Sequence, residues 1–320
     1  MTISIAMATY NGGRYIEEQL ASFASQTLLP DELVVSDDCS NDDTLAIVER
    51  FTRHAPFAVR IRRNAHTLGF GQNFGKAIGL CGGDLIFLSD QDDVWFPEKL
   101  GTVSTALDRA PGCFFVINDL EISDGDLRRT GLTGLGQRRA LGTGHDSFDF
   151  GCCMAFRASI RPLILPIPEV IVHDVWINMV ALAADARCLL ESPLQLYRRH
   201  GNNTSQSIGN SLSRVRWVDQ FAAEPIKTSK DYYLGQRDLL GVLVQRFENL
   251  GTEGYRQLNA SRPFQDVIAR LEARREALAT RGALVESGWL SRKLLATVMW
   301  AKGDYRHFRG WKSFAKDVLR

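Results

Sequence analysis

The sequence predicts an α/β protein with a mostly parallel, Rossmann-like sheet flanked by helices and followed by a helical C-terminal extension. Short apolar runs alternate with helical patterns over the first hundred residues. This alternation is typical of a parallel sheet with helices on its faces. Polar and glycine-rich segments follow several of the apolar runs. Helical patterns dominate from about residue 210 onward, so we expect two parts, residues 1–205 and residues 206–320.

The apolar runs are predicted strands because they are short and turn-forming residues bound them. They comprise residues 3–8, a run that begins at 33–35, and residues 59–63, 84–88, 113–117 and 148–156. Helices are expected between them. Residues 14–26 carry apolar side chains at helical spacing, and further helices are predicted after residues 40–43, at 71–80, from Pro97 and at 174–184.

Three local patterns add detail to this assignment. Asp43 stands three residues after Ser40, which matches a capping box at the start of a helix. Residues 125–147 are rich in Gly and Arg and are expected to form a long loop or flap. In the C-terminal part, one helical face carries Leu239, Leu240, Leu243, Val244 and Phe247.

The composition is that of a globular protein, with 320 residues of which 45% are hydrophobic and 23% charged. The net charge of +1 gives no electrostatic indication of nucleic-acid binding. The charge is uneven, however. Residues 1–100 carry 8 Lys/Arg against 14 Asp/Glu, and residues 251–320 carry 14 against 7. The excess of acidic residues in 1–100 suits the binding of a divalent cation. The excess of basic residues in 251–320 indicates either contact with an anionic surface or helix faces exposed to solvent.

The cysteines and the apolar runs give expectations about location. None of the six cysteines forms a Cys-x-x-Cys pair, and several lie in apolar runs, where Cys acts as a small hydrophobe. We therefore expect a reducing, cytoplasmic compartment. The first residues lack the basic and long apolar regions of a signal peptide. No apolar run approaches the ~18–20 residues that span a bilayer.

Polar clusters directly follow three of the predicted strands. They are Thr9-Tyr10-Asn11, Ser36-Asp37-Asp38 and Ser89-Asp90-Gln91-Asp92-Asp93. Asp and Asn are also common in turns and helix caps, so each cluster alone has a structural explanation. Ligands of parallel α/β sheets bind at the carboxyl ends of strands, and three such clusters together indicate a binding site.

The segment Asp90-Gln91-Asp92-Asp93 is the strongest of the three clusters. Three carboxylates within four residues repel one another, and a bound cation relieves that repulsion. Carboxylate oxygens are hard ligands that suit Mg²⁺ or Mn²⁺. Mg²⁺ commonly takes phosphate oxygens as its remaining ligands, so a diphosphate is the expected co-ligand.

These motifs resemble family 2 glycosyltransferases of the GT-A fold. The resemblance rests on residues 8–12, 35–40 and 87–95, the last being similar to the Asp-x-Asp region of the rhamnosyltransferase-like branch. His173-Asp174-Val175-Trp176 and residues 197–203 also resemble that branch in type and order. The similarity covers roughly residues 1–205. It implies a nucleotide-sugar donor and a saccharide or lipid-linked saccharide acceptor.

The resemblance also implies roles for individual residues. Nucleotide base and ribose would be held by Thr9, Tyr10, Asn11, Asp37 and Asp38. A carboxylate can accept a hydrogen bond from the imide N–H of uracil or thymine. Asp92 would contact the metal directly, and Asp90 would face the donor ribose or the metal. Asp93 would either assist Asp90 and Asp92 or cap the helix expected near Pro97.

Further roles are implied in the second half of this region. Asp174 would be the general base that takes the acceptor hydroxyl's proton in an inverting transfer; alternatively it caps a helix beginning at Val175. His200 would reach back to the metal or the diphosphate, and Arg198 and Arg199 would clamp phosphate. Residues 151–154 would line the acceptor pocket or form a buried strand. Trp95 and Trp176 could stack on a sugar, although core packing is their commoner fate. The role of His173 stays open.

The resulting expectation is an inverting, metal-dependent hexosyltransferase of cell-surface polysaccharide assembly. The resemblance favours rhamnose from dTDP-rhamnose, with a UDP-sugar as the other possibility. The main alternative is a non-catalytic module that binds a nucleotide sugar or a glycan. A dinucleotide oxidoreductase is a weaker alternative, because the glycines of residues 69–75 have the wrong last gap and do not follow the first strand. A phosphoryl-transfer enzyme could also use Asp90 and Asp92, but the sequence contains no P-loop motif.

The C-terminal region carries an apolar helical stripe over residues 289–300 with basic residues around and after it. The basic residues are Arg292, Lys293, Lys302, Arg306, Arg309, Lys312 and Lys316. An aromatic and basic amphipathic segment can lie on an anionic membrane surface. Packing of this helix on the catalytic domain is the alternative. The first possibility predicts peripheral contact with the inner face of the plasma membrane.

Overall fold

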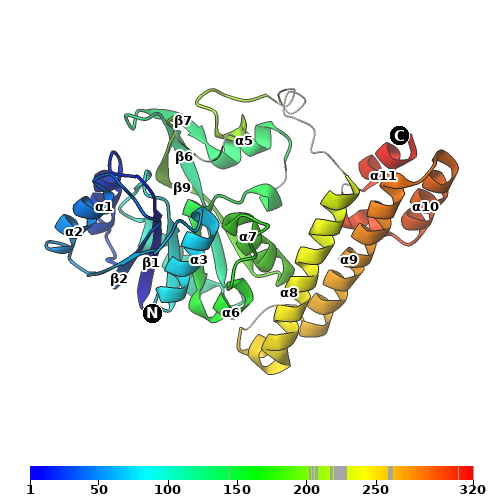
Figure 1. Ribbon diagram of the computed structural model, residues 1–320, viewed down its shortest axis with the longest axis horizontal. Helices are drawn as coiled ribbons and strands as arrows, with labels where there is room; N and C mark the ends of the chain where they lie inside the picture. Colours follow the sequence, from blue (N-terminus) through cyan, green and yellow to red (C-terminus); the bar gives the residue numbers. More distant parts are fainter. Residues whose placement is uncertain are drawn as a thin grey trace. The chain divides into compact units, whose positions relative to one another are not determined.

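The computed structural model describes residues 1–143, 145–201, 203, 205, 208–216, 219, 229–258, 262–308 and 310–319 (Figure 1). The chain divides into two compact units, Met1–Ala223 and Glu224–Arg320. Each unit has its own buried core. Asn202 and Arg309, which the sequence analysis noted, lie outside the described residues.

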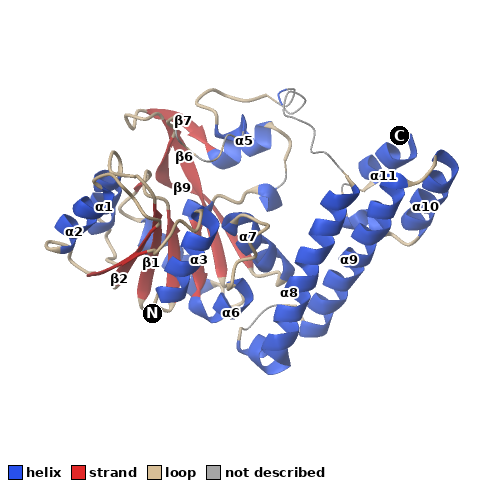
Figure 2. Ribbon diagram, viewed as in Figure 1, coloured by secondary structure: helices blue, strands red, loops and turns tan. Residues whose placement is uncertain are grey.

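The described residues of the first unit contain one nine-stranded sheet (Figure 2). Its order is β3-β2-β1-β4-β8-β6-β9-β5, and β7 pairs with β6. The strands are β1 (Ile3–Thr9), β2 (Glu32–Asp37), β3 (Ala58–Arg63), β4 (Leu85–Ser89), β5 (Val94–Trp95), β6 (Phe115–Ser123), β7 (Arg129–Thr133), β8 (Met154–Arg157) and β9 (Arg187–Arg198).

Strand directions confirm the predicted, mostly parallel sheet. β1 runs parallel to both β2 and β4, β2 runs parallel to β3, and β6 runs parallel to β9. β8 is antiparallel to β4 and β6, and the short strands β5 and β7 are antiparallel to β9 and β6. Because β1, β2 and β4 are parallel neighbours, their carboxyl ends lie at one edge of the sheet.

Helices cover the sheet because its alternating side chains are apolar. Ile3, Ile5 and Met7 of β1 project to one face, as expected for a period of two, and pack with apolar residues of α1, α2 and α4. α3 packs against β1 and β2. The helices of this unit are α1 (Ile16–Ala24), α2 (Thr44–Thr52), α3 (Phe70–Leu80), α4 (Lys99–Arg109), α5 (Gly134–Ala140), α6 (Arg161–Ile164) and α7 (His173–Ala183). The 3₁₀ turns are η1 (His145–Ser147), η2 (Gly151–Cys153), η3 (Ala158–Ile160) and η4 (Ile208–Asn210).

The structure corrects the predicted strand over residues 148–156 and the predicted loop over residues 125–147. The predicted strand 148–156 is a strand only from Met154 onward, because Gly151–Cys153 form the turn η2. A short apolar run does not distinguish a buried turn from a strand. Residues 125–147 are no simple loop, since β7 pairs with β6 and α5 follows, capped by Thr133 Oγ1, which accepts from the Gly136 N–H.

The expected capping box is also absent. α2 begins at Thr44, and its first backbone N–H binds Asp42 Oδ1 at 3.0 Å. Ser40 instead donates its hydroxyl to Asp37 Oδ1 at 2.5 Å. Asp174 does not cap α7 either, because that helix begins at His173 and Asp174 lies within its first turn. In both cases the side chain bonds to a near neighbour in sequence instead, Ser40 to Asp37 and Asp174 to the Val175 N–H.

Cys113 and Cys188 form a disulfide with their Cα atoms 6.1 Å apart. The parallel pairing of β6 and β9 brings them together, since Val116 lies opposite Cys188. The sequence analysis did not predict this pairing and expected a reducing compartment instead. Cys81, Cys152 and Cys153 are free and buried, as expected for small apolar side chains.

The second unit is helical, as the sequence predicts. It contains α8 (Lys230–Gln257), α9 (Phe264–Glu286), α10 (Trp289–Ala301), the 3₁₀ turn η6 (Asp304–His307) and α11 (Trp311–Leu319). The expected apolar face of α8 is buried, and Gly251 (φ 69°) interrupts that helix. Ala296, Met299 and Tyr305 are central to a small core with Leu284. Among the described residues, no helix has the length and apolar character needed to cross a membrane.

Candidate functional site

The sheet brings the three predicted polar clusters together at one edge. Thr9 of β1 lies opposite Asp37 of β2, and its Oγ1 donates to Asp37 Oδ1 at 3.0 Å. Gln91, just beyond β4, accepts from the Tyr10 N–H and donates to the Tyr10 carbonyl, both at 2.9 Å. The β1 end is therefore tied to the ends of both neighbouring strands.

The two carboxylates that follow β2 organise the surrounding loops. Asp37 is fully buried and accepts from the Ser40 N–H at 2.9 Å as well as from its hydroxyl. Asp38 is 3% exposed and accepts from Asn64 Nδ2 and from the backbone N–H groups of Leu68 and Gly69, at 2.7–2.9 Å. These bonds fix the turn where α3 begins.

Tyr10 and Asn11 present the open part of this edge. The Tyr10 side chain is 53% exposed. Asn11 has a positive φ of 47°, a conformation in which Asn is enriched, and its Oδ1 accepts from the Asn41 N–H at 2.9 Å. An exposed aromatic ring beside a rigid polar loop is suited to a planar ligand such as a nucleobase.

Asp93 is a buried structural anchor of the acidic segment. It accepts from Gln195 Nε2 at 2.9 Å and from the Arg198 N–H at 3.1 Å, both of β9. Burial, together with the charge of Asp92, raises the pKa of Asp93 to about 7. Lys99 Nζ donates to the Cys152 carbonyl and to Gln195, and burial lowers its pKa to about 8. The predicted helix cap is not formed, because α4 begins at Lys99.

Asp92 meets His200 although 108 residues separate them in sequence. His200 Nε2 lies 2.8 Å from Asp92 Oδ2, and Asn203 Nδ2 donates to the same oxygen at 3.3 Å. The His200 ring stacks on Tyr15 with ring centroids 4.5 Å apart. Both the carboxylate (17% exposed) and the imidazole (10%) keep some contact with solvent.

Asp90 lies where several carboxylates converge. Burial raises its pKa well above the ordinary value, and the charges of Asp92, Asp93 and Asp174 raise it further. Asp174 also has a raised pKa of about 7, first from burial and then from the charge of Asp149. Asp174 Oδ1 accepts from the Val175 N–H at 2.7 Å. The charge of the predicted base Asp174 therefore acts on Asp90.

This cluster has the chemistry of a divalent-cation site. The carboxylates repel one another and offer hard oxygen donors, and an imidazole nitrogen stands beside them. Atoms of Asp90, Asp93 and Cys152 lie within 4.8 Å of one another. That trio is a poor ligand set, because Asp93 is occupied by β9 and the pKa of Cys152 is raised well above its usual value. Asp90, Asp92 and His200 carry harder donor atoms, and Asp92 and His200 are in contact, but among the described residues these three do not form a group with all ligand atoms within 4.8 Å.

Comparison with known proteins identifies the segment that holds this edge. Residues 4–161 match the sequence model of "Glycosyl transferase family 2". This segment is a family 2 glycosyltransferase domain. The dTDP-rhamnosyl transferase RfbG of Shigella flexneri is 41% identical over 98 residues, which are 29% of this chain and 34% of that protein. The abequosyltransferase RfbV of Salmonella typhimurium is 33% identical over 110 residues, 34% and 33% of the two chains. The chain thus spans about a third of the length of these two relatives.

Solved structures support the fold of the glycosyltransferase domain. S. aureus TarS 1–349 in complex with UDP-GlcNAc superposes with a TM-score of 0.56 at 16% identity, covering 99% of this chain and 89% of that one. TarS 1–349 in complex with UDP gives 0.55 at 17% identity, covering 95% and 80%. At this level of identity the likeness concerns the fold alone.

His173 is an unusual group beside the site of the glycosyltransferase domain. It is 5% exposed and stacks on Phe74 with centroids 4.0 Å apart. Burial lowers its pKa to about 3, so the imidazole is neutral. Neither ring nitrogen has a hydrogen-bond partner among the described residues. A Cβ on Gly151 would lie 2.6 Å from His173 Nε2, so the absence of a side chain at Gly151 makes room for the ring.

Several site residues escaped the sequence analysis or have different roles from those expected. Gln91, Lys99 and Gln195 connect segments far apart in sequence, and a single sequence gives no signal for such pairings. Arg198 is 2% exposed, and its guanidinium contacts the carbonyls of Asp92 and Gly125 as well as Glu18. It therefore supports the Asp92 loop, a role that the sequence analysis did not predict. Trp95 and Trp176 are core residues.

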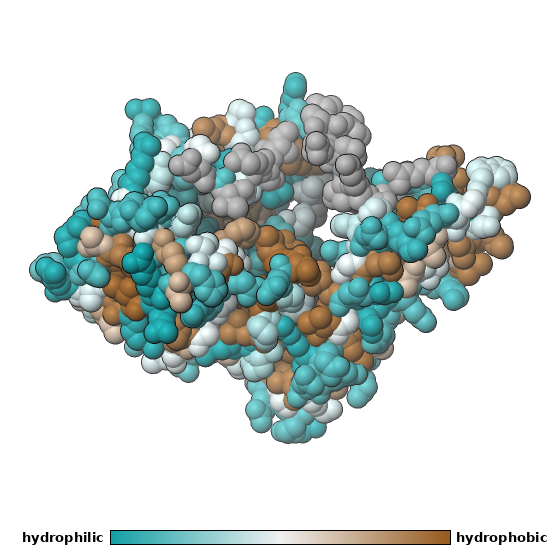
Figure 3. Space-filling view, viewed as in Figure 1, coloured by the Kyte–Doolittle hydropathy of each residue, from teal (hydrophilic) through white to brown (hydrophobic). Residues whose placement is uncertain are grey.

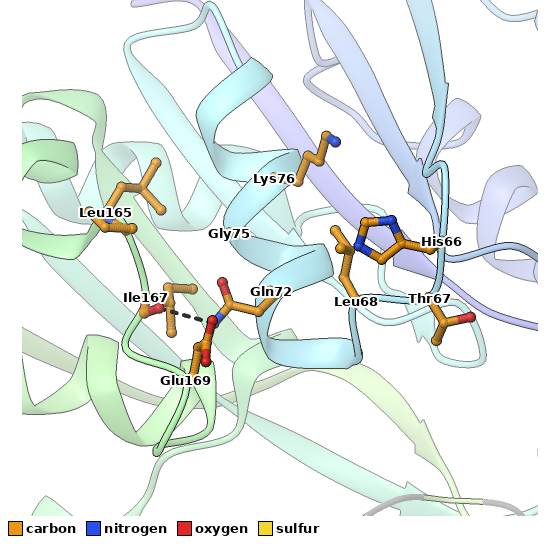
Figure 4. Close-up of a pocket in the computed structure, with 10 residues that line it drawn as sticks. His66, Thr67, Leu68, Gln72, Gly75, Lys76, Leu165, Ile167 and Glu169 are labelled. Carbon is orange, nitrogen blue, oxygen red and sulfur yellow. Dashed lines mark hydrogen bonds between the residues drawn. The ribbon is translucent and has the colours of Figure 1, made fainter.

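A groove of about 890 Å³ runs beside α3 (Figure 4). His66 and Thr67 lie on one side and Glu169 on the other, and Gln72 between them donates to the Ile167 carbonyl at 3.0 Å. None of the predicted site residues lines this groove. The glycines of residues 69–75 lie here, where Gly71 approaches Ile171 and His173 and Gly75 approaches Ile167. Gly69 has a positive φ of 81° just before α3, which follows β3 and not β1.

Proposed function

We propose that this chain is an inverting, metal-dependent glycosyltransferase that moves a sugar from a nucleotide-sugar donor to an acceptor hydroxyl. The observation that carries the proposal is the meeting of the polar ends of β1, β2 and β4 at one edge of the sheet, where Asp92 also contacts His200 at 2.8 Å. The charge of Asp174 acts on Asp90 at this edge and raises its pKa. The family 2 domain over residues 4–161 supports it.

The proposed donor site uses the ends of β1 and β2. Thr9, Asp37 and Asp38 are buried and shape the loops. Tyr10 and Asn11 are exposed, and the nucleotide would bind against them. A magnesium or manganese ion would be held by Asp90, Asp92 and His200. When bound, such an ion supplies positive charge to the departing diphosphate.

The proposed catalytic base is Asp174. Inverting transfer requires a group that accepts the proton of the acceptor hydroxyl as its oxygen attacks the anomeric carbon. A carboxylate with a pKa of about 7 is a better proton acceptor at neutral pH than an ordinary one. Its position in the first turn of α7 and the bond from the Val175 N–H fix its direction.

The proposed donor sugar is rhamnose from dTDP-rhamnose, and a UDP-sugar is the other candidate. RfbG, by its name, uses the first kind of donor, and TarS binds UDP-GlcNAc. The proposed acceptor is a saccharide or lipid-linked saccharide of cell-surface polysaccharide assembly. We place the reaction in the cytoplasm, at the inner face of the plasma membrane, where a water-soluble donor can meet a lipid-linked acceptor.

Two carboxylate variants test the proposal, because each is expected to fail at a different step. Asp174→Asn should keep donor binding in Mn²⁺ and lower transfer by roughly 10²–10⁴-fold, the usual worth of a general base. Asp92→Ala should lose both transfer and the Mn²⁺-dependent thermal shift with dTDP-rhamnose or UDP-sugars. Transfer is measured by donor consumption with acceptor present.

The control for both variants is Asp108→Asn, which changes an exposed carboxylate on α4. It should behave like the unmodified chain in both measurements. Normal turnover in Asp174→Asn would refute its role as base, and unchanged metal dependence in Asp92→Ala would refute the metal assignment. Donor binding without turnover in the unmodified chain, across a panel of acceptors, would favour a non-catalytic binding module.

A further inference from the structure

The end of the helical unit exposes an unusual amount of apolar surface. Seven of the eighteen large hydrophobic residues found exposed in the described part of the chain lie in α10 and α11. The most exposed in α10 are Trp289 (60%), Leu290 (74%) and Leu294 (68%), and α11 adds Trp311 (65%) and Leu319 (85%). Figure 3 shows hydrophobic residues where Figure 1 draws α10. A concentration of exposed apolar side chains of this kind indicates an interaction site.

The exposed side chains share one face of α10. At 3.6 residues per turn, Trp289, Leu290, Leu294, Val298 and Trp300 fall within about 180° of the helix circumference. Met299 lies on the opposite side and Ala296 just beyond the edge of this arc, and both are buried in the core of this unit. The Trp300 ring also packs on Phe314, with ring centroids 4.7 Å apart. α10 therefore has one face committed to its own unit and a second apolar face directed to solvent.

Unpaired cations accompany this apolar face. Residues 288–320 contain 8 Lys/Arg against 2 Asp/Glu, a balance of +6. Within the described residues, Lys293, Lys302, Lys312 and Lys316 have no carboxylate within ion-pair distance. On α8 and α9, by contrast, Lys230 pairs with Glu286 and several arginines pair with neighbouring acids. The positive charge beside the apolar face is thus not neutralised within the unit.

The combination of side chains fits a lipid surface. Indole rings favour the interface between hydrocarbon and water, and lysines beside them are attracted to anionic headgroups. Lys293 Nζ lies 3.9 Å from the Trp289 ring, so a lysine and a tryptophan stand together on this face. An interface between two copies of the chain would be disfavoured by the repulsion of the two sets of lysines.

We propose that α10 and α11 form a peripheral binding surface for anionic membrane lipids, with Trp289, Leu290 and Leu294 inserted among the headgroups. The surface would hold the enzyme where a lipid-linked acceptor is available. Binding to lipid does not depend on transfer, so this inference can fail while the proposed function stands, and the reverse also holds.

The test is co-sedimentation of the full chain with vesicles in the absence of donor and acceptor. We expect the protein to pellet with vesicles of phosphatidylglycerol and phosphatidylcholine, and to remain largely in solution with pure phosphatidylcholine. Raising the salt from 0.05 to 0.5 M should weaken binding, since salt screens the lysines.

Trp289→Ser, Leu290→Ser and Leu294→Ser together should abolish pelleting. Tyr232→Ser with Val242→Ser, two exposed apolar sites on α8, is the matched control and should pellet normally.

A second pair of variants isolates the charge. Replacing Lys293, Lys312 and Lys316 by Gln should weaken binding to anionic vesicles by on the order of 100-fold, at roughly fivefold per lysine. Replacing the paired Arg237, Arg256 and Arg275 by Gln should have a much smaller effect. Circular dichroism and donor binding verify that each variant is folded.

Three outcomes would overturn the proposal. The unmodified chain could stay in solution with anionic vesicles at low salt. The folded triple-serine variant could bind as well as the unmodified chain. Finally, the unmodified chain could be a dimer that the triple-serine substitution converts to a monomer, which would assign the face to a second copy.

Discussion

Individual side chains in the site are tuned by burial and by neighbouring charge. Asp93 and Asp174 both have a pKa of about 7, but for different uses. Asp93 is enclosed by hydrogen bonds from β9, whereas Asp174 makes one bond to the Val175 N–H and retains acceptor capacity. A carboxylate with free lone pairs and a raised pKa is the one suited to take a proton.

The pH dependence of turnover should report the pKa of Asp174. A general base acts only when deprotonated, so kcat/KM should fall as the pH drops through about 7. The negative charge of Asp149 raises that pKa, after burial, because it disfavours a second negative charge. Asp149→Asn should therefore move the acid limb of the profile to lower pH and increase kcat/KM at pH 6 severalfold. The measurement is kcat/KM between pH 5 and 9.

Asp146→Asn serves as the matched control for this experiment. Asp146 precedes Asp149 by three residues, and its side chain is 84% exposed. Its removal should leave the profile in place. An acid limb that stays unchanged, or moves to higher pH, in Asp149→Asn would contradict the assignment of Asp174 as the titrating base.

At the scale of elements, α3, η2 and α7 meet around one imidazole. His173 begins α7, stacks on Phe74 of α3 and approaches Gly151 of η2. A buried polar group without a partner costs about 1–3 kcal/mol, so this site is retained at the expense of stability. Because Asp174 is the next residue, the packing of His173 also positions the proposed base.

Gly151→Ala should disturb this junction. The added Cβ would lie 2.6 Å from His173 Nε2, and Phe74 at a centroid distance of 4.0 Å limits the movement of the ring. We expect a loss of roughly 1–3 kcal/mol in the free energy of unfolding, the usual cost of overpacking, and reduced turnover with little change in donor binding. Urea unfolding and steady-state kinetics measure the two effects.

Gly79→Ala on α3 is the control, because its Cβ would meet Leu165 at an ordinary 3.6 Å. That variant should be as stable as the unmodified chain or more stable by about 0.5–1 kcal/mol, since Ala favours a helix interior. If Gly151→Ala were equally stable, the close contact would have no energetic consequence and the positioning argument would fail.

The elements also show what a single sequence can predict. The strands and their polar ends follow from local patterns, because β1, β2 and β4 are short apolar runs bounded by turns. The capping box failed because Ser40 bonds to Asp37, a partner outside the box. The predicted 148–156 strand failed because Gly151–Cys153 form the buried turn η2, which a short apolar run does not distinguish from a strand. Similarly, local sequence marks Asp90 and Asp92 as an acidic cluster but gives no sign of the Gln91, Lys99 and Gln195 pairings.

The whole chain consists of two units with different charge and separate cores. The first unit contains the acidic strand ends and the large core beside β1 and β2. The second contains the basic α10 and α11 and a small core around Tyr305. We therefore assign the proposed transfer reaction to the first unit and the proposed membrane contact to the second.

The small core around Tyr305 in the second unit contains a buried ion pair, and breaking it should destabilise that unit selectively. Arg281 Nε lies 3.0 Å from Asp317 Oδ2, both side chains are 7% exposed, and Tyr305 Oη donates to the same carboxylate at 3.1 Å. Asp317→Asn leaves a buried cation without its counter-charge, which should cost about 3 kcal/mol and lower the melting temperature of this unit by more than about 10 °C. Asp238→Asn, in an exposed pair with Arg237, should change little.

Thermal unfolding with and without UDP and Mn²⁺ distinguishes the two units. The ligands should raise the melting temperature of the first unit, Met1–Ala223, and leave that of the second unchanged. If Asp317→Asn lowered both transitions equally, the two units would not be independent in stability.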